Sequence, residues 1–187
     1  MPLRGLRIAL VLVGMTLTAC ALQPASPVRT SLPPLPDVNA LACCWQSEEQ
    51  VQVTRQGSTQ SLHTVVAVTE GLLTVVMLDP TGRRLLTLRY DSESGLVELG
   101  KPPGWDSRFS TLLLAAIFLH HQTSGPWPAG GSGWTVRTHG GEKTLFHHNR
   151  AVMGIRYADD GAGQTRILEM PGSEITLEVT TLNRTTL

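Results

Sequence analysis

The residues best suited to chemistry in this sequence are six histidines and three cysteines. Four of the histidines form the adjacent pairs His120-His121 and His147-His148, while His63 and His139 stand alone. Adjacent side chains point about 100° apart on a helix and to opposite faces of a strand, so neither pair predicts a shared metal site. No His-Glu-x-x-His segment is present. We therefore expect histidines that lie at the surface or are hydrogen-bonded, and no metal centre.

The sequence also lacks the motifs of common catalytic and cofactor sites. Gly130-Gly131-Ser132-Gly133 does not fit the Gly-x-Ser-x-Gly turn of hydrolases, and no glycine motif for phosphate or dinucleotide binding follows a strand. Asp159-Asp160-Gly161 lacks the further ligands of a calcium loop and predicts a turn. We expect a protein that is not an enzyme, with no catalytic residue and no cofactor.

Cys43 and Cys44 are adjacent, which limits how they can pair. A trans peptide holds neighbouring Cα atoms about 3.8 Å apart, less than the roughly 4.4–6.8 Å that disulfides usually span. Two buried thiols are the favoured interpretation. A strained vicinal disulfide is the first alternative, and a metal or redox site is the second.

The third cysteine, Cys20, follows an N-terminal segment built like an export signal. Arg4 and Arg7 precede an apolar run over residues 8–17, and the small residues Thr18 and Ala19 lead to the cysteine. A run of this length is too short to cross a hydrocarbon core of about 30 Å as a helix. The pattern predicts a signal peptide over residues 1–19.

The four residues Leu17-Thr18-Ala19-Cys20 resemble the lipobox of bacterial lipoproteins. The resemblance implies cleavage before Cys20 and a covalent diacylglyceryl group, usually with a further acyl chain, on this residue. Several chains are needed for stable attachment, since each buried CH₂ contributes only about 0.8 kcal/mol. Ala21 in place of an Asp implies sorting to the outer membrane, with the protein lipid-anchored on its periplasmic face.

Composition predicts one folded domain behind a spacer. Residues 20–40 hold five prolines and little charge, which is typical of an extended tether after the lipidated cysteine. The remaining residues 41–187 are enough for one domain. The formal net charge is zero and charged residues make up 16% of the chain. The absence of a basic block argues against a nucleic-acid partner.

Alternating apolar residues predict short strands separated by Gly, Pro, Asn and Asp turns. The expected strands are residues 61–69, 72–78, 84–90, 96–99, 134–138, 143–148, 151–157, 166–170 and 174–182. Apolar residues at helical spacing over residues 109–119 predict one helix, with Asp106 or Ser107 as its N-cap. This helix is apolar all round and is therefore expected to be buried. Residues 123–133 predict a loop.

Strands joined by short turns pair antiparallel. The predicted fold is α+β and mainly antiparallel: an unclosed, strongly curved half-barrel of about ten strands, with the apolar helix on its concave face. We find no internal repeat.

Three segments carry a resemblance to a known family: LLTVVMLDPTGRRLLTLRY at residues 72–90, Pro102-Pro103-Gly104, and Gly125-Pro126-Trp127-Pro128. Together with the apolar helix, they resemble the LolB-like outer-membrane lipoproteins of unknown function that are often encoded beside aryl-polyene biosynthesis genes. These are related in fold to the lipoprotein receptor LolB and its carrier LolA. The resemblance covers residues 43–182 and implies a cavity that receives acyl chains.

The resemblance implies an outer-membrane lipoprotein that receives a lipoprotein or aryl-polyene lipid from a LolA-like periplasmic carrier. The expected cavity lining is Val66, Val68, Leu86, Leu88, Leu113, Ile117, Met153 and Ile155. The alternative is a dry core in a non-catalytic scaffold lipoprotein of an envelope assembly. LolB also carries an exposed, membrane-inserting Leu in the turn that here holds Thr81. A Thr gains little from the bilayer, so this departure weakens the expectation of lipoprotein insertion.

Overall fold

The structure is a computed structural model that describes residues 31–187 except residues 123, 129–130, 132, 159–164 and 172. Residues Ser31–Leu187 form one compact unit. The predicted signal peptide, Cys20 with Ala21, and the turn at residues 159–161 lie outside the described residues. Within the described part of the chain, no helix is both long and apolar enough to span a membrane.

The described residues of this unit form one antiparallel sheet of eleven strands, in the order β5-β4-β3-β2-β1-β11-β10-β9-β8-β7-β6. It consists of two meanders that meet where β1 pairs with β11. The first comprises β1 (Trp45–Arg55), β2 (Ser58–Thr69), β3 (Leu72–Leu78), β4 (Arg84–Asp91) and β5 (Gly95–Leu99). The second comprises β6 (Gly125–Pro126), β7 (Trp134–His139), β8 (Glu142–His147), β9 (Arg150–Tyr157), β10 (Thr165–Glu169) and β11 (Ile175–Thr186).

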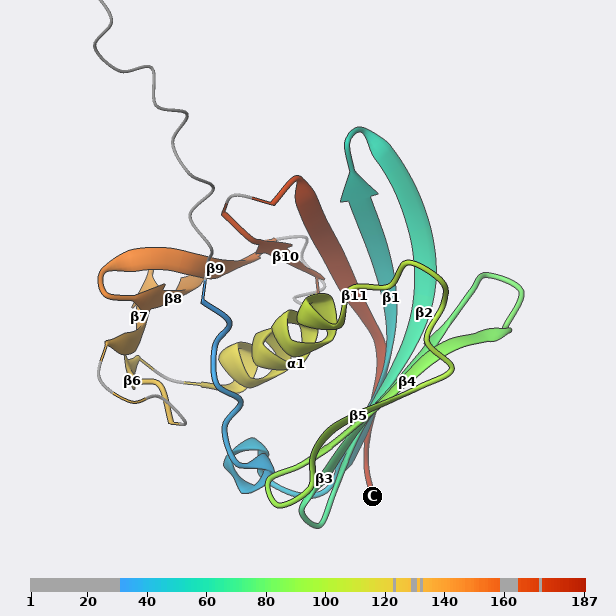
Figure 1. Ribbon diagram of the computed structural model, residues 1–187, viewed down its shortest axis with the longest axis horizontal. Helices are drawn as coiled ribbons and strands as arrows, with labels where there is room; N and C mark the ends of the chain where they lie inside the picture. The colour runs from blue at the N-terminus through green and yellow to red at the C-terminus, as the bar shows by residue number, and fades with distance from the viewer. Residues whose placement is uncertain (1–30, 123, 129–130, 132, 159–164, 172) are drawn as a thin grey trace, which may run out of the picture. The chain divides into compact units, whose positions relative to one another are not determined.

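The predicted fold class is confirmed. The sheet curves around helix α1 (Ser107–His121), with β7–β9 on one side of the helix and β1–β4 on the other (Figure 1). Among the described residues, the end strands β5 and β6 do not pair with each other, so the sheet is open. The prediction did not list β1 as a separate strand, and it placed the two-residue β6 within a loop.

The inner face of the first meander follows from strict alternation. Leu73, Val75 and Met77 of β3 are all buried. Val75 pairs with Val66 of β2 and with Leu88 of β4, so the apolar residues form a continuous row across three strands. Each such side chain contributes roughly 1.5–3 kcal/mol when it leaves water. The tight turn after β2 depends on Gly71, whose φ of 70° suits glycine.

Helix α1 starts as predicted at a capping residue. The Asp106 side chain accepts a hydrogen bond from the Arg108 backbone N–H at 2.9 Å, which satisfies one of the free donors of the first turn. Buried residues occupy the helix from Leu114 to Leu119 without a break. The helix can be apolar all round because the curved sheet surrounds it.

Part of the predicted tether over residues 20–40 is packed on the domain, from Pro33 onward. Pro33 and Pro36 are buried, and a 3₁₀ turn, η1 (Val38–Leu41), follows. Trp127 Nε1 donates to the Pro34 carbonyl at 2.6 Å, and Tyr90 Oη donates to the Pro36 carbonyl at 3.0 Å. Buried Trp and Tyr side chains need acceptors for their polar ends, and this segment supplies them.

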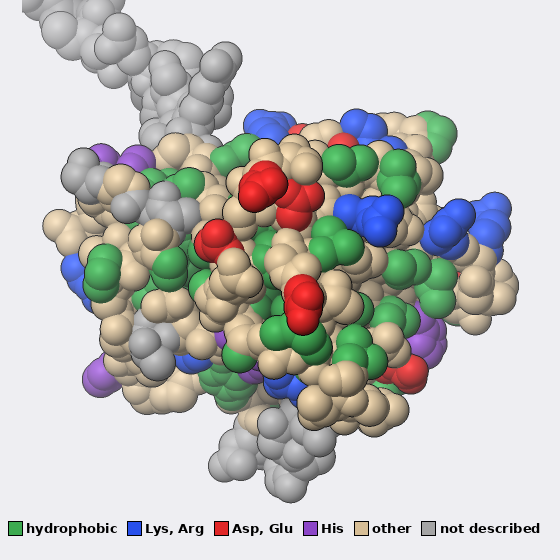
Figure 2. Space-filling view, turned by 90° about the horizontal axis from the view of Figure 1, so that it is seen from below, with side chains coloured by type: hydrophobic (Ala, Val, Ile, Leu, Met, Phe, Trp, Pro, Cys, Tyr) green, Lys and Arg blue, Asp and Glu red, His purple; other side chains and the backbone are tan. Residues whose placement is uncertain are grey.

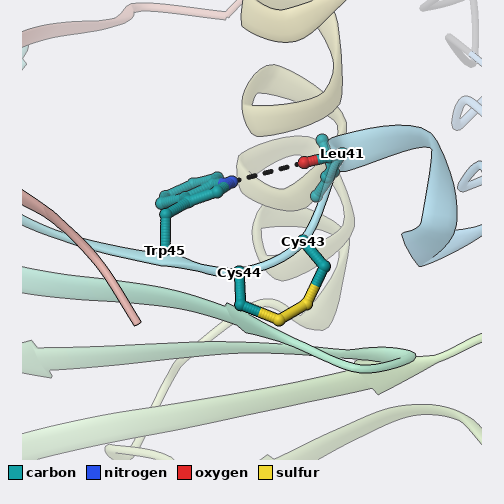
Figure 3. Close-up of a disulfide and its surroundings, with 4 residues drawn as sticks. All are labelled: Leu41, Cys43, Cys44 and Trp45. Carbon is teal, nitrogen blue, oxygen red and sulfur yellow. Dashed lines mark hydrogen bonds between the residues drawn. A yellow bond between two sulfur atoms is a disulfide. The ribbon is translucent and has the colours of Figure 1, made fainter.

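Cys43 and Cys44 form a disulfide between η1 and β1 (Figure 3). The favoured expectation of two buried thiols is therefore wrong, and the vicinal disulfide is what the structure shows. The pair lies outside the core, since Cys43 is exposed and Cys44 is half-buried. The next residue, Trp45, is buried in the core. Its indole Nε1 donates to the Leu41 carbonyl at 3.3 Å.

Candidate functional site

A cavity of about 30 Å³ lies between α1 and the inner face of the sheet. We call it the α1 cavity. Most of its lining is apolar and comes from both meanders and the helix: Glu49, Val51, Thr64, Val66, Val75, Leu113, Ala116, Ile117, Ile155, Arg166, Leu168, Leu177 and Val179. A space of this size holds about one water molecule. The helix therefore fills nearly all of the concave face.

The structure brings together four of the eight residues predicted to line a lipid cavity. Val66, Leu113, Ile117 and Ile155 all border the α1 cavity. The other four are buried in the surrounding core and are not part of this lining: Val68, Leu86, Leu88 and Met153. Lipid contact at any of the eight stays a prediction.

An ion pair that the sequence analysis missed also borders the cavity. Arg166 Nη2 of β10 donates to Glu49 Oε1 of β1 at 2.5 Å, and the side chains are only 14% and 9% exposed. Arg166 Nη1 also donates to Thr181 Oγ1 at 3.0 Å, and Ser47 Oγ donates to Glu49 at 3.2 Å. Buried charges require such partners, because desolvation costs several kcal/mol per ion.

One signal could have revealed Glu49. On β1 the inward positions alternate as Trp45, Ser47, Glu49 and Val51, all of them buried. A carboxylate in the inward phase of an otherwise apolar alternation predicts a buried partner.

A third polar group in the cavity has no partner. The Thr64 hydroxyl is buried and makes no hydrogen bond within the described part of the chain. Thr64 lies directly opposite Glu49 in the β1–β2 pairing. A buried hydroxyl of this kind is uncommon and costs about 1–3 kcal/mol when nothing binds it.

A second pocket adjoins the α1 cavity near the C-terminal end of the helix. We call it the polar pocket; it is lined by Trp45, Ser47, Glu49, Val66, Ile117, His120, His121, Arg166, Thr181 and Arg184. Four residues belong to both linings: Glu49, Val66, Ile117 and Arg166. The two spaces therefore share a wall that is half apolar and half charged.

The two histidines of the polar pocket are held in place from several strands. His120 Nδ1 lies 2.9 Å from Tyr157 Oη, and the His120 carbonyl accepts from Lys143 Nζ at 2.5 Å. The His121 ring lies 5.1 Å from the Trp45 ring, and the Arg184 guanidinium covers the Trp45 ring at 4.4 Å.

Burial lowers the pKa of both histidines, and the neighbouring cations lower it further. The pKa of His120 falls to about 3, and that of His121 falls to about 4. After burial, the largest single cause is Arg166 for His120 and Arg184 for His121. Both imidazoles are therefore neutral at pH 7 within a cationic environment.

Other predicted features are surface structures. The turn after β3 forms as expected: Asp79 accepts from the Thr81 backbone N–H at 2.9 Å and from its hydroxyl at 2.6 Å. Thr81 is exposed, and its hydroxyl is occupied by this bond. Hydrogen bonds, led by that of the Thr81 hydroxyl, lower the pKa of Asp79. Across the described ranges, no three His, Cys, Asp or Glu side chains gather as a metal site would require.

The face shown in Figure 2 is mixed, with hydrophobic side chains scattered among polar and charged ones. Among the described residues, the large exposed apolar side chains are Leu32, Val97, Leu99, Leu182 and Leu187. Single exposed apolar residues are normal on soluble domains and assign no binding surface.

Comparison with known proteins identifies a family but no activity. No curated protein matches the sequence. A domain from Vibrio parahaemolyticus named for outer membrane lipoprotein sorting is 7% identical, with a TM-score of 0.38 over 76% of this chain and 84% of that one. A DUF1329 family protein from Desulfovibrio piger is 10% identical, with a TM-score of 0.30 over 80% and 88%. Neither likeness is close enough to assign a function.

The family model described as a protein of unknown function, DUF3261, matches residues 46–183. This span begins one residue into β1 and ends within β11. It includes every lining residue of the α1 cavity, and all those of the polar pocket except Trp45 and Arg184. The chain therefore belongs to the DUF3261 family.

Proposed function

We propose that this protein binds the apolar chain of a lipid between α1 and the sheet, as a non-enzymatic lipid-handling lipoprotein of the cell envelope. The observation that carries the proposal is the α1 cavity: an apolar space between an apolar helix and the concave face of an open sheet. Lipidation of Cys20 would anchor the domain at the periplasmic face of the outer membrane. A LolA-like carrier would be its partner, as the sequence resemblance implies.

The size of the cavity requires that α1 moves when a lipid binds. Binding pockets for ligands of drug size enclose about 300–1,000 Å³, whereas the α1 cavity holds about 30 Å³. Apolar packing is non-directional, so methylene groups can replace the contacts that the middle of α1 makes with the sheet. The proposed ligand therefore takes the place of helix–sheet contacts.

Polar contacts hold the two ends of α1 and would guide such a movement. Near its start, Ser107 Oγ and Ser110 Oγ donate to Glu98, at 2.7 and 2.5 Å. At its end, Lys143 Nζ donates to the His120 carbonyl. The middle of the helix, from Leu113 to Ile117, meets the cavity through apolar side chains. Outward displacement would break few directional bonds if one end stayed fixed.

The small volume is also the observation that favours the alternative. If α1 never moves, the space beneath it is ordinary core. The protein would then be a non-catalytic scaffold lipoprotein that meets its partners through exposed loops.

The test uses the full chain carrying Cys20→Ser, so that no acyl group is attached, with monomyristoylglycerol as the probe. Native mass spectrometry and titration calorimetry should show one lipid bound per chain. Ala116→Phe places a ring in the α1 cavity and should weaken binding at least tenfold. Ala40→Phe makes the same change at an exposed residue of η1 and is the matched control.

Two outcomes would contradict the proposal. One is a chain that binds no lipid at all. The other is equal binding by the parent chain and Ala116→Phe. Circular dichroism checks that the variant folds, and Ala116→Leu fills the same space with less strain if the ring proves too large.

A further inference from the structure

The polar pocket lies where the headgroup of a cavity-bound amphiphile would emerge. It shares Glu49, Val66, Ile117 and Arg166 with the α1 cavity, so one molecule can contact both spaces. Its other lining residues are mainly polar, and Arg184 lies at its exposed side. An apolar chain that enters beneath α1 from this side would leave its polar end among these residues.

The charges around this pocket are predominantly positive. Arg166 and Arg184 line it, and Lys143 lies beside His120. Each of these three cations lowers the pKa of both His120 and His121. Several cations around one pocket create a positive potential, and such a potential attracts anions.

The carboxylate of Glu49 offsets the charge of Arg166, with which it is paired, and leaves Lys143 and Arg184 to make the field around the histidines positive. Its Oε1 is bound by Arg166 and by Ser47, on the side of the pocket that adjoins the α1 cavity. Arg184 lies instead over Trp45, at the surface. An arriving anion would be repelled from the Glu49 side and attracted to Arg184, which fixes the direction in which an amphiphile enters.

We propose that the polar pocket is the headgroup site of an amphiphile whose head carries a phosphate or carboxylate. The proposal rests on the proposed function, since the apolar chain must occupy the α1 cavity. Arg184 would bind the anionic head, and Trp45 would pack against the first part of the chain. Guanidinium groups suit such heads because they donate paired hydrogen bonds to carboxylate and phosphate oxygens.

The test compares monomyristoylglycerol with its phosphate ester, myristoyl-lysophosphatidate, on the full chain carrying Cys20→Ser. These lipids have the same chain and differ by one phosphate. The phosphate ester should bind about tenfold more tightly at low salt, and 0.5 M NaCl should reduce this preference because salt screens exposed charges. Inorganic phosphate alone, the third arm, should bind far more weakly than the ester.

Arg184→Gln should reduce the preference for the ester, measured as the ratio of the affinities for the two lipids, about threefold. Arg89→Gln is the matched control, because Arg89 is exposed on β4 and outside both linings. A second readout is the proton NMR titration of the histidines. The ester should raise the pKa of His121 from about 4, and monomyristoylglycerol should not. The charged groups around both rings are Lys143, Arg166 and Arg184, with Glu49 in the same pocket.

The outcomes show whether the headgroup site fails alone or together with lipid binding. Equal affinity for the two lipids, or a preference that Arg184→Gln leaves intact, would overturn the headgroup site while lipid binding stands. Inorganic phosphate that binds as tightly as the ester would show a small-anion site and also overturn it. Failure of both lipids to bind would overturn the proposed function together with this inference.

Discussion

The two ends of the space beneath α1 differ in chemistry although the same helix covers both. Toward the centre of the sheet, Val51, Val75 and Leu177 present apolar side chains to the α1 cavity. Toward the end of the helix, the Glu49–Arg166 pair and two neutral histidines face the polar pocket. A plain hydrophobic core has no need of a buried ion pair, since apolar residues of similar volume often serve as well or better. The proposed binding of an amphiphile requires this contrast between an apolar and a polar space.

The largest effect on the free energy of unfolding should come from removing one partner of the Glu49–Arg166 ion pair. Glu49→Leu leaves Arg166 buried without its carboxylate and should lower the free energy of unfolding by about 3–5 kcal/mol. The double variant Glu49→Leu/Arg166→Met should recover most of that loss, because it removes both charges. Urea denaturation of the two variants and the parent measures this. A double variant no more stable than the single one would show that the pair is needed for packing.

Truncation of apolar residues of α1 and the sheet should lower stability more, the more deeply the residue is buried. Leu88 is fully buried and lies outside the cavity lining. Leu88→Ala should lower the free energy of unfolding by about 3 kcal/mol, because a void replaces packed atoms. Leu113 already borders the α1 cavity and is half-buried, so Leu113→Ala should cost only about 1 kcal/mol. Thermal denaturation of both variants checks the order. Equal losses would mean that Leu113 is as tightly packed as the core.

The protein should become less stable as the pH falls, because His120 and His121 of the polar pocket resist protonation in the folded state. The folded-state pKa values of about 3 for His120 and about 4 for His121 lie below the roughly 6.5 of an exposed histidine. Below pH 6.5 the unfolded chain gains protons that the folded chain does not. The contribution of the two neutral histidines to the free energy of unfolding is thus fully present above about pH 6.5, and it is lost as the pH falls toward 4 and then 3. We expect a loss of about 1–2 kcal/mol between pH 7 and pH 5, after allowance for solvent screening.

The variant His121→Gln separates the effect of histidine protonation on stability from the effect of carboxylate protonation. His121→Gln should remove about half of the acid-induced loss in urea unfolding at pH 5. A variant with the same pH dependence as the parent would show that His121 is not protonated differently in the two states.

The smallest effect concerns the unpartnered hydroxyls. Thr64→Val and Thr87→Val each replace a buried hydroxyl that has no hydrogen-bond partner in the described structure, and each should stabilise the fold by up to about 1 kcal/mol. Thr64 lines the α1 cavity and Thr87 does not. If a ligand or a water in the α1 cavity forms a hydrogen bond with the Thr64 hydroxyl, only Thr64→Val should weaken lipid binding. Calorimetry on both variants makes the comparison.

The sequence predicted the local elements well because their signals are local. The alternation that defines β3, the short turn between the strands predicted at residues 61–69 and 72–78, and the Asp106 cap all depend on residues close to one another in the sequence. The curved, open sheet followed from short turns between strands, which enforce antiparallel pairing.

Long-range contacts account for what was missed. Arg166 and Glu49 are 117 residues apart and meet only because β11 pairs with both β1 and β10. Pro34 is packed through a hydrogen bond from Trp127, 93 residues away. Neither contact leaves a periodic pattern, and strand register decides both. Of the eight predicted lining residues, Leu86 and Leu88 on β4 are buried in the core and do not border the α1 cavity.

The central claim is that a lipid chain lies between α1 and the sheet, and nuclear Overhauser effects test it most directly. The full chain carrying Cys20→Ser would be deuterated except at Ile, Leu and Val methyl groups, and mixed with protonated myristoyl-lysophosphatidate. We predict effects from the chain methylenes to the methyl groups of Val66, Ile117 and Ile155, and none to the core residue Leu88. Effects confined to the exposed edge residues Val97 and Leu99, or effects to no methyl group at all, would contradict the account.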